Sequence, residues 1–179
     1  QLAVAILGMT TSEEDGAQAV DQLLSHLADW NEVRVSRPFE LCRAIGEDAG
    51  ALVQRCQQLI TALNSVYRQE NKPSLDRLKN LGRREARQHL EKLAGFDDYA
   101  VASVFLWSLG GHAIPVNDAL LGALREAELV DPSADRAEVQ AFLERNISAV
   151  DAKEFCVLMN SFVAEHRGSA SRSRAAAGR

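Results

Sequence analysis

The chain has 179 residues, a formal net charge of −5, and 46% hydrophobic but only 6% aromatic residues. This length supports one domain with a sizeable core, or two small lobes. No apolar run approaches the roughly 18 residues that span a bilayer, so we expect no membrane partner. Three widely spaced cysteines and a start that does not resemble a signal peptide favour a reducing, cytoplasmic setting.

Helical periodicity runs through nearly the whole chain, and no alternating strand pattern is present, so we predict an all-α fold. Trp30 to Val35 is predicted as a compact connector with an aromatic anchor. The predicted helices cover approximately residues 2–9, 13–27, 38–45, 49–67, 75–81, 83–93, 98–109, 117–128, 135–145 and 151–166.

The C-terminal segment 167–179 contains only Gly, Ser, Ala and Arg, and we expect it to be a disordered tail after a domain that spans 1–166. The tail holds four arginines and no acid. Without these four, the 20 basic residues become 16 against 25 acids, which is a net charge of −9. Such a charge argues against a strong general affinity for a phosphate backbone.

Two stretches carry the most information: Leu93-Ala-Gly-Phe-Asp-Asp-Tyr99, and Gly110-Gly-His-Ala-Ile-Pro-Val-Asn-Asp-Ala-Leu120. The first indicates a helix that ends in a tight turn, where Gly95 supplies a positive φ and Phe96 an apolar plug. A very apolar helix follows. The second stretch is a turn that delivers an amide and a carboxylate onto a third helix.

This order and spacing resemble the endonuclease III-like helix-hairpin-helix DNA glycosylases. The similarity covers roughly residues 2–166 and is specific between 93 and 120. It implies a two-lobed helical domain with a cleft, a hairpin at 93–98 and a partner that is double-stranded, damaged DNA. Its base-excision-repair members act on a base flipped out of the duplex.

The resemblance assigns DNA contacts to the hairpin residues Gly95, Phe96 and Asp97, and it places Thr10 where the family has a glutamine wedge. Asp97 replaces the second hairpin glycine, and its carboxylate both caps helix amides and repels phosphate. The alternative is therefore a helix-turn-helix held by an ordinary aspartate cap.

A basic run lies on the helix that enters the hairpin: Arg83, Arg84 and Arg87. On that helix the three arginines lie on the side expected for a DNA backbone. The alternative is a solvated face paired with Glu85 and Glu91.

In the catalytic frame that the resemblance implies, Tyr99 occupies the position of the Schiff-base lysine, and Asn117 that of the essential aspartate. A lyase needs an amine nucleophile, so we expect no lyase route. Asp118, one residue later, is the candidate that activates water in a monofunctional glycosylase, with Tyr99 lining the pocket. The alternative is that Asn117 or Asp118 simply caps the following helix.

No metal or cofactor is expected. The four-cysteine loop for an iron–sulfur cluster is absent, since only Cys156 lies near the C-terminus, and the four histidines have no metal-ligand spacing. His112 is expected to be a turn histidine bonded to backbone. Two functions remain: a DNA-binding protein of the base-excision-repair glycosylase type, or an inactive relative that recognises a protein or a structure.

Overall fold

The computed structural model describes residues 1–46 and 50–177, and within them it contains helices and no strand, which confirms the all-α prediction. The first half holds α1 (Leu2–Gly8), α2 (Glu13–His26), α3 (Trp30–Val35), α4 (Pro38–Ile45) and α5 (Gly50–Glu70). The second half holds the 3-10 helix η1 (Asp76–Asn80), α6 (Arg83–Glu91), α7 (Asp98–Trp107), α8 (Asp118–Glu126), α9 (Arg136–Asn146) and α10 (Ala152–Ala177).

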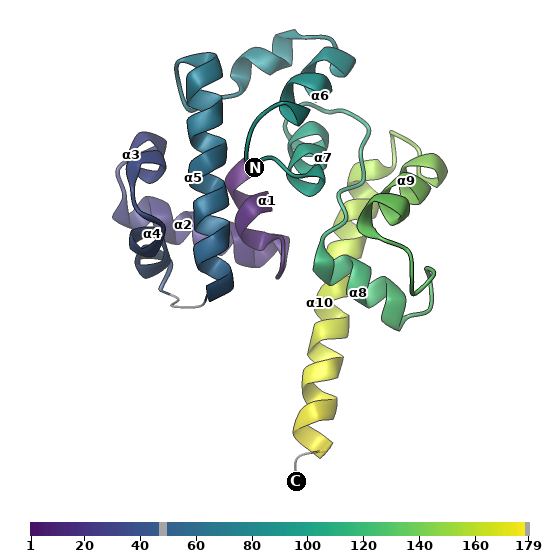
Figure 1. The fold of residues 1–179 in the computed structure, drawn as a ribbon. Helices are drawn as coiled ribbons and strands as arrows, with labels where there is room; N and C mark the ends of the chain where they lie inside the picture. Colours follow the sequence, from purple (N-terminus) through teal and green to yellow (C-terminus); the bar gives the residue numbers. More distant parts are fainter. Residues whose placement is uncertain (47–49, 178–179) are drawn as a thin grey trace.

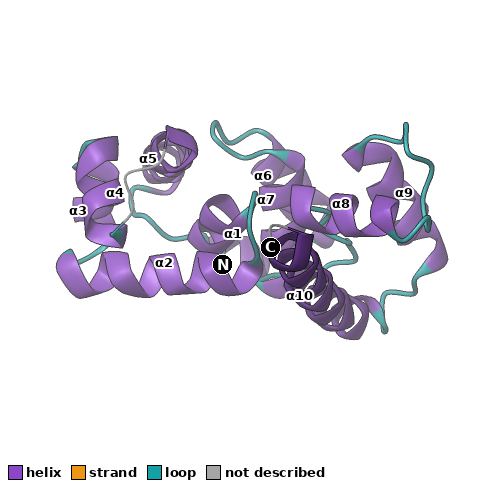
Figure 2. Cartoon of the chain, turned by 90° about the horizontal axis from the view of Figure 1, so that it is seen from below, coloured by secondary structure: helices purple, strands orange, loops and turns teal. Residues whose placement is uncertain are grey.

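The buried apolar side chains form two large cores. One core lies among the five helices from α1 to α5, and Leu23, Leu41 and Leu59 are fully buried in it. The other joins the end of α5 to α6 through α10, and Leu90, Leu106 and Ile114 are its centre. Seen from below, α3, α4 and α5 lie on one side and α8 and α9 on the other, with α1 between them (Figure 2).

The helix α7 connects the two cores. Eight of its ten residues, Tyr99 to Leu106, are buried, because this helix has almost no polar face. Ala100 near its start belongs to the first core, whereas Val104 and Leu106 belong to the second. The chain segments on both sides of α7 are therefore held at the junction of the two cores.

The last helix is longer than the sequence indicated. α10 was expected to end at His166, before a disordered tail, but its backbone is helical through Ala177, and it extends beyond α8 (Figure 1). Alanine and arginine have high helix propensity, which favours continuation of the helix into this segment. Residues 178–179 of the expected tail lie outside the described residues.

Two shorter elements also differ from the expectation. The connector at Trp30–Val35 is a helix, because the Asp29 carboxylate accepts hydrogen bonds from the amides of Asn31 (2.8 Å) and Glu32 (3.0 Å) at its start. The helix expected around Leu78 is a single 3-10 segment. Across the part of the chain that the structure describes, no helix has the length and apolar character to cross a membrane.

Candidate functional site

The hairpin between α6 and α7 is held against the middle of α5. Gly95 has φ +84°, as the turn requires. The Gln58 side-chain amide on α5 donates to the Gly95 carbonyl (3.1 Å), and the Ala94 amide donates to the Ser65 hydroxyl (3.0 Å). Phe96 is half-buried and packs against both cores. The hairpin is therefore a fixed part of the fold.

Asp97 caps α7. Its Oδ1 accepts from the Ala100 amide (2.8 Å), and its Oδ2 accepts from the Gln58 amide (3.0 Å). Asp98, the first residue of α7, is exposed. The start of this helix thus carries two carboxylates at the place where a bare helix terminus attracts an anion.

Arg55 on α5 links the hairpin to the end of α1. One guanidinium nitrogen, Nη1, donates to the Met9 sulfur (2.9 Å) and to Gln58 Oε1 (3.2 Å). Thr10 follows Met9, is exposed, and lines with Arg55 a cavity of about 540 Å³. Thr10, at the expected wedge position, and the hairpin therefore both lie along α5, and the Arg55 guanidinium lies between them.

The two positions that the resemblance assigns to catalysis come together in space. Tyr99 is buried, and its hydroxyl makes hydrogen bonds with the side chains of Ser103 and Asn117. Burial, reinforced by the negative charge of Glu13, raises the pKa of Tyr99 to about 12. Tyr99 is thus a neutral phenol at physiological pH.

Asn117 is the N-cap of α8. It is buried, and its Oδ1 accepts a hydrogen bond from the Leu120 amide at 2.7 Å. Asp118, the next residue, is half-exposed at the surface, where its Oδ1 lies 3.5 Å from Arg136 Nη1. Of the two residues expected to cap this helix, Asn117 does so, and the Asp118 carboxylate lies outside the space around Tyr99.

The space beside Tyr99 and Asn117 is nearly closed, with a volume of about 10 Å³. Its wall comes from α2, α7, α8 and α10, and includes Glu13, Trp107, Phe155, Cys156, Met159 and Asn160. The Glu13 carboxylate accepts from the amides of Asn160 (2.7 Å) and Gln1 (3.0 Å), which ties α2 to α10 across the junction. A space of this size holds about one water molecule.

The basic run on α6 divides into two parts. Arg87 is paired with Glu91 (3.1 Å) and Glu144 (4.0 Å). Arg83 and Arg84 are exposed at the start of the helix. Arg87 fits the expected paired face, whereas Arg83 and Arg84 remain available at the surface.

His112 has the surroundings that the sequence suggested, and the three cysteines are buried. His112 Nε2 lies 2.9 Å from the Ile147 carbonyl oxygen, so this histidine is bonded to backbone as expected. Cys42, Cys56 and Cys156 are buried free thiols. Burial, with a smaller effect of the Glu13 charge, raises the pKa of Cys156 to about 12.

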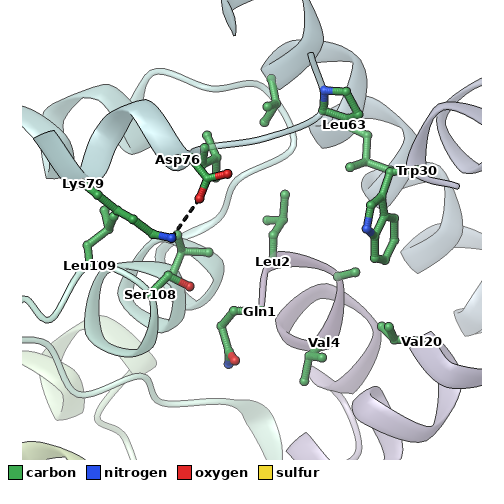
Figure 3. A pocket seen from close by; sticks show the side chains of 15 residues that line it. Gln1, Leu2, Val4, Val20, Trp30, Leu63, Asp76, Lys79, Ser108 and Leu109 are labelled. Atoms are coloured by element: carbon green, nitrogen blue, oxygen red, sulfur yellow. Dashed lines mark hydrogen bonds and ion pairs between the residues drawn. The ribbon is translucent and has the colours of Figure 1, made fainter.

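A second cavity, of about 240 Å³, lies at the start of α1 (Figure 3). Leu2, Val20, Trp30 and Leu63 form much of its apolar wall. Figure 3 draws one ion pair at this cavity, between Lys79 and Asp76 at 2.8 Å, and the opposite charges of these two side chains neutralise each other. None of the residues that the sequence marked for function lines this cavity.

Several residues of the site carried no sequence signal. Arg55, Gln58 and Asn160 lie on helices where polar residues usually face solvent. Glu13 is one of three acids in the first turn of α2, where acids offset the helix dipole, so its sequence position alone does not mark it for the site. Their roles depend on how α5 and α10 pack against the rest of the chain.

Comparison of the chain with protein-family models and with curated proteins found no match.

Proposed function

We propose that this chain is a helix-hairpin-helix DNA-binding protein of the endonuclease III type in which base removal has been lost. One observation carries the proposal: Tyr99 and Asn117, at the positions where the family has lysine and aspartate, meet in a nearly closed space of about 10 Å³. The frame of a glycosylase site is retained, but it holds neither its nucleophile nor its carboxylate.

The loss of chemistry follows from the side chains. A phenol with a pKa of about 12 is a weak nucleophile at pH 7, and a neutral amide does not offset a positive sugar cation. The nearest carboxylate in the wall, Glu13, is occupied by two hydrogen bonds. Ligand pockets commonly need about 300 Å³ or more, so the closed space also excludes a flipped base.

The support for a DNA partner is the surface along α5. The hairpin at Gly95 and the loop at Thr10 are both bonded to this helix, through Gln58 and through Arg55 beside Met9. The Met9 sulfur and the Gln58 side-chain oxygen are neutral acceptors, so these two bonds do not offset the positive charge of Arg55. The exposed arginines of α6 add further cations.

The experiment is a pair of measurements on the full chain. Binding to a duplex with an abasic-site analogue is compared with binding to an undamaged duplex at two salt concentrations, and base release is followed on a panel of damaged duplexes. We expect salt-sensitive binding that prefers the abasic analogue, without base release. Arg55→Gln should weaken duplex binding several-fold, whereas Arg145→Gln, at an exposed position on α9, should not weaken it.

Two outcomes overturn the proposal. Base release that disappears in the Asp118→Asn variant would show that this carboxylate is catalytic. Absence of duplex binding at low salt would remove DNA as the partner.

A second function, a protein-interaction module, is favoured by a different surface. Leu129 and Phe142 are exposed by 63% and 49% and line a cavity of about 470 Å³ between α9 and the loop that precedes it. Exposed apolar side chains around a cavity are typical of protein contacts. If the chain is such a module, Phe142→Glu should abolish binding of the protein partner and leave duplex binding unchanged.

A further inference from the structure

Two cysteines that are distant in the sequence are in direct contact. Cys42 on α4 and Cys56 on α5 are fully buried, and their sulfur atoms lie 3.7 Å apart. Both belong to the first core, whereas Cys156, the third thiol, belongs to the second. The chain therefore holds one thiol pair and one thiol outside it.

The two sulfur atoms are in contact but not yet at bonding distance. Bonded sulfur atoms lie about 2.05 Å apart, so the two sulfur atoms must approach by about 1.7 Å. The Cys42 thiol already donates a hydrogen bond to the Cys56 sulfur, so no other group lies between them. Neighbours in this core, including Leu41 and Leu59, are apolar.

We propose that Cys42 and Cys56 are an oxidative modification site, at which a peroxide converts the pair into a disulfide that links α4 to α5. In the first step, the sulfur of one thiolate takes an oxygen atom from hydrogen peroxide, and hydroxide leaves. In the second, the other thiol attacks this sulfenic acid, the S–S bond forms, and water leaves. The two thiols lose two hydrogen atoms, and the peroxide is reduced to two molecules of water.

The reaction is gated by the packing of the core. Burial and the neighbouring Cys42 thiol raise the pKa of Cys56 above its usual range, so little thiolate forms while the helices are packed. Oxidant reaches the sulfur atoms during local opening of α4 from α5. The disulfide should therefore form slowly at neutral pH and faster at higher pH or in mild urea.

The test uses the full chain, treated with hydrogen peroxide, blocked with an alkylating reagent and analysed by intact mass and peptide mapping. We expect a product in which Cys42 is linked to Cys56 with the loss of two hydrogen atoms, so that only Cys156 is left to be alkylated, and a thiol reductant reverses the link. The crosslink should raise the midpoint of thermal unfolding by about 5–10 °C.

Matched variants separate the pair from the third thiol. Cys156→Ala should still form the crosslink at the same rate, whereas Cys42→Ala and Cys56→Ala should not form it. Circular dichroism of each variant confirms folding, and the Cys156→Ala result alone decides the question if a variant in the pair does not fold.

Three results would overturn the inference. One is oxygen addition to Cys42 or Cys56 without a crosslink. Another is a disulfide that contains Cys156 or joins two chains. The third is failure to crosslink in mild urea, where alkylation shows that both thiols are accessible. The outcome is independent of DNA binding, so it leaves the proposed function untouched.

Discussion

Gly95 lies so close to Ala62 that a β-carbon at Gly95 would come within 2.6 Å of the Ala62 amide nitrogen. The same β-carbon would lie 2.9 Å from the Gln58 carbonyl oxygen, so it would meet the backbone of α5 rather than a movable side chain. The turn also needs the positive φ of Gly95. Glycine is thus what allows the hairpin to rest directly on α5.

Gly95→Ala should therefore destabilise the protein by about 2–4 kcal/mol, through backbone strain and the displacement of α5. Urea unfolding followed by circular dichroism measures this. The control is Gly122→Ala in α8, where nothing lies within 4 Å of the added carbon and φ is not positive. It should stabilise the helix by about 0.5–1 kcal/mol. Equal effects at both glycines would contradict the close approach.

Asp97→Asn tests whether the hairpin faces DNA. The carboxamide oxygen can still accept the hydrogen bond from the Ala100 amide, so the cap is kept, while one negative charge and the bond from Gln58 to the second oxygen are removed. If a phosphate lies nearby, duplex binding should tighten by about 3–10-fold at low salt, because a repulsion of about 1 kcal/mol disappears. Fluorescence anisotropy with a labelled duplex measures the change.

Asp97→Gly, which frees the helix amides as well, should tighten binding at a cost in stability, since it loses the cap. Asp21→Asn, at an exposed position on α2, is the control for a simple change in net charge. Unchanged or weaker binding in Asp97→Asn would mean that the hairpin does not face the duplex.

Much of the fold follows from the sequence, because apolar periodicity and caps are local. Ser12, Asp97 and Asp135 cap their helices through bonds to residues only three positions away. Tyr99 and Asn117 were singled out only through the family resemblance, and the structure brings their side chains together. The six-residue helix α3 was missed because it is too short to show a helical period.

The contacts between distant helices did not follow from the sequence. The bond between Asn160 and Glu13 joins residues 147 positions apart, and that between Gln58 and Asp97 joins residues 39 apart. In the sequence, a polar residue such as Gln58 occupies the same helical positions whether its side chain faces solvent or bonds to another segment. Only the packing of α5 and α10 decides which of them reach the site.

The ion pair of Glu70 with Arg77 should make the free energy of unfolding depend on pH. Its side chain is 2% exposed, accepts two hydrogen bonds from Arg77 (2.7 and 2.9 Å) and has His89 at 3.2 Å. The hydrogen bonds from Arg77 lower the pKa of Glu70 below its ordinary value of 4.5, and the charges of Arg77 and His89 lower it further. Because the folded pKa is the lower one, this stabilisation is complete above about pH 5 and is lost as the pH falls through the folded pKa.

Glu70→Gln should therefore cost about 1–2 kcal/mol at pH 7, and the difference from the wild type should shrink as the pH falls below about 4. Urea unfolding at a series of pH values measures it. Glu126→Gln, at an exposed position on α8, should show little effect at any of these pH values. A difference that stays constant, or that grows as the pH falls, would contradict the role of the Arg77 pairing.

Asn117 and Asp118 are neighbours with different roles, and their alanine variants should separate these roles. Asn117→Ala removes both the bond to the Leu120 amide and one of the two partners of the buried Tyr99 hydroxyl, so it should cost about 2 kcal/mol or more. Asp118→Ala removes a 3.5 Å pair with Arg136 and an acid from the first turn of α8, and should cost less than about 1 kcal/mol. Chemical unfolding of the two variants under identical conditions gives the comparison. If Asp118→Ala is the more damaging, the carboxylate rather than the amide organises the start of α8.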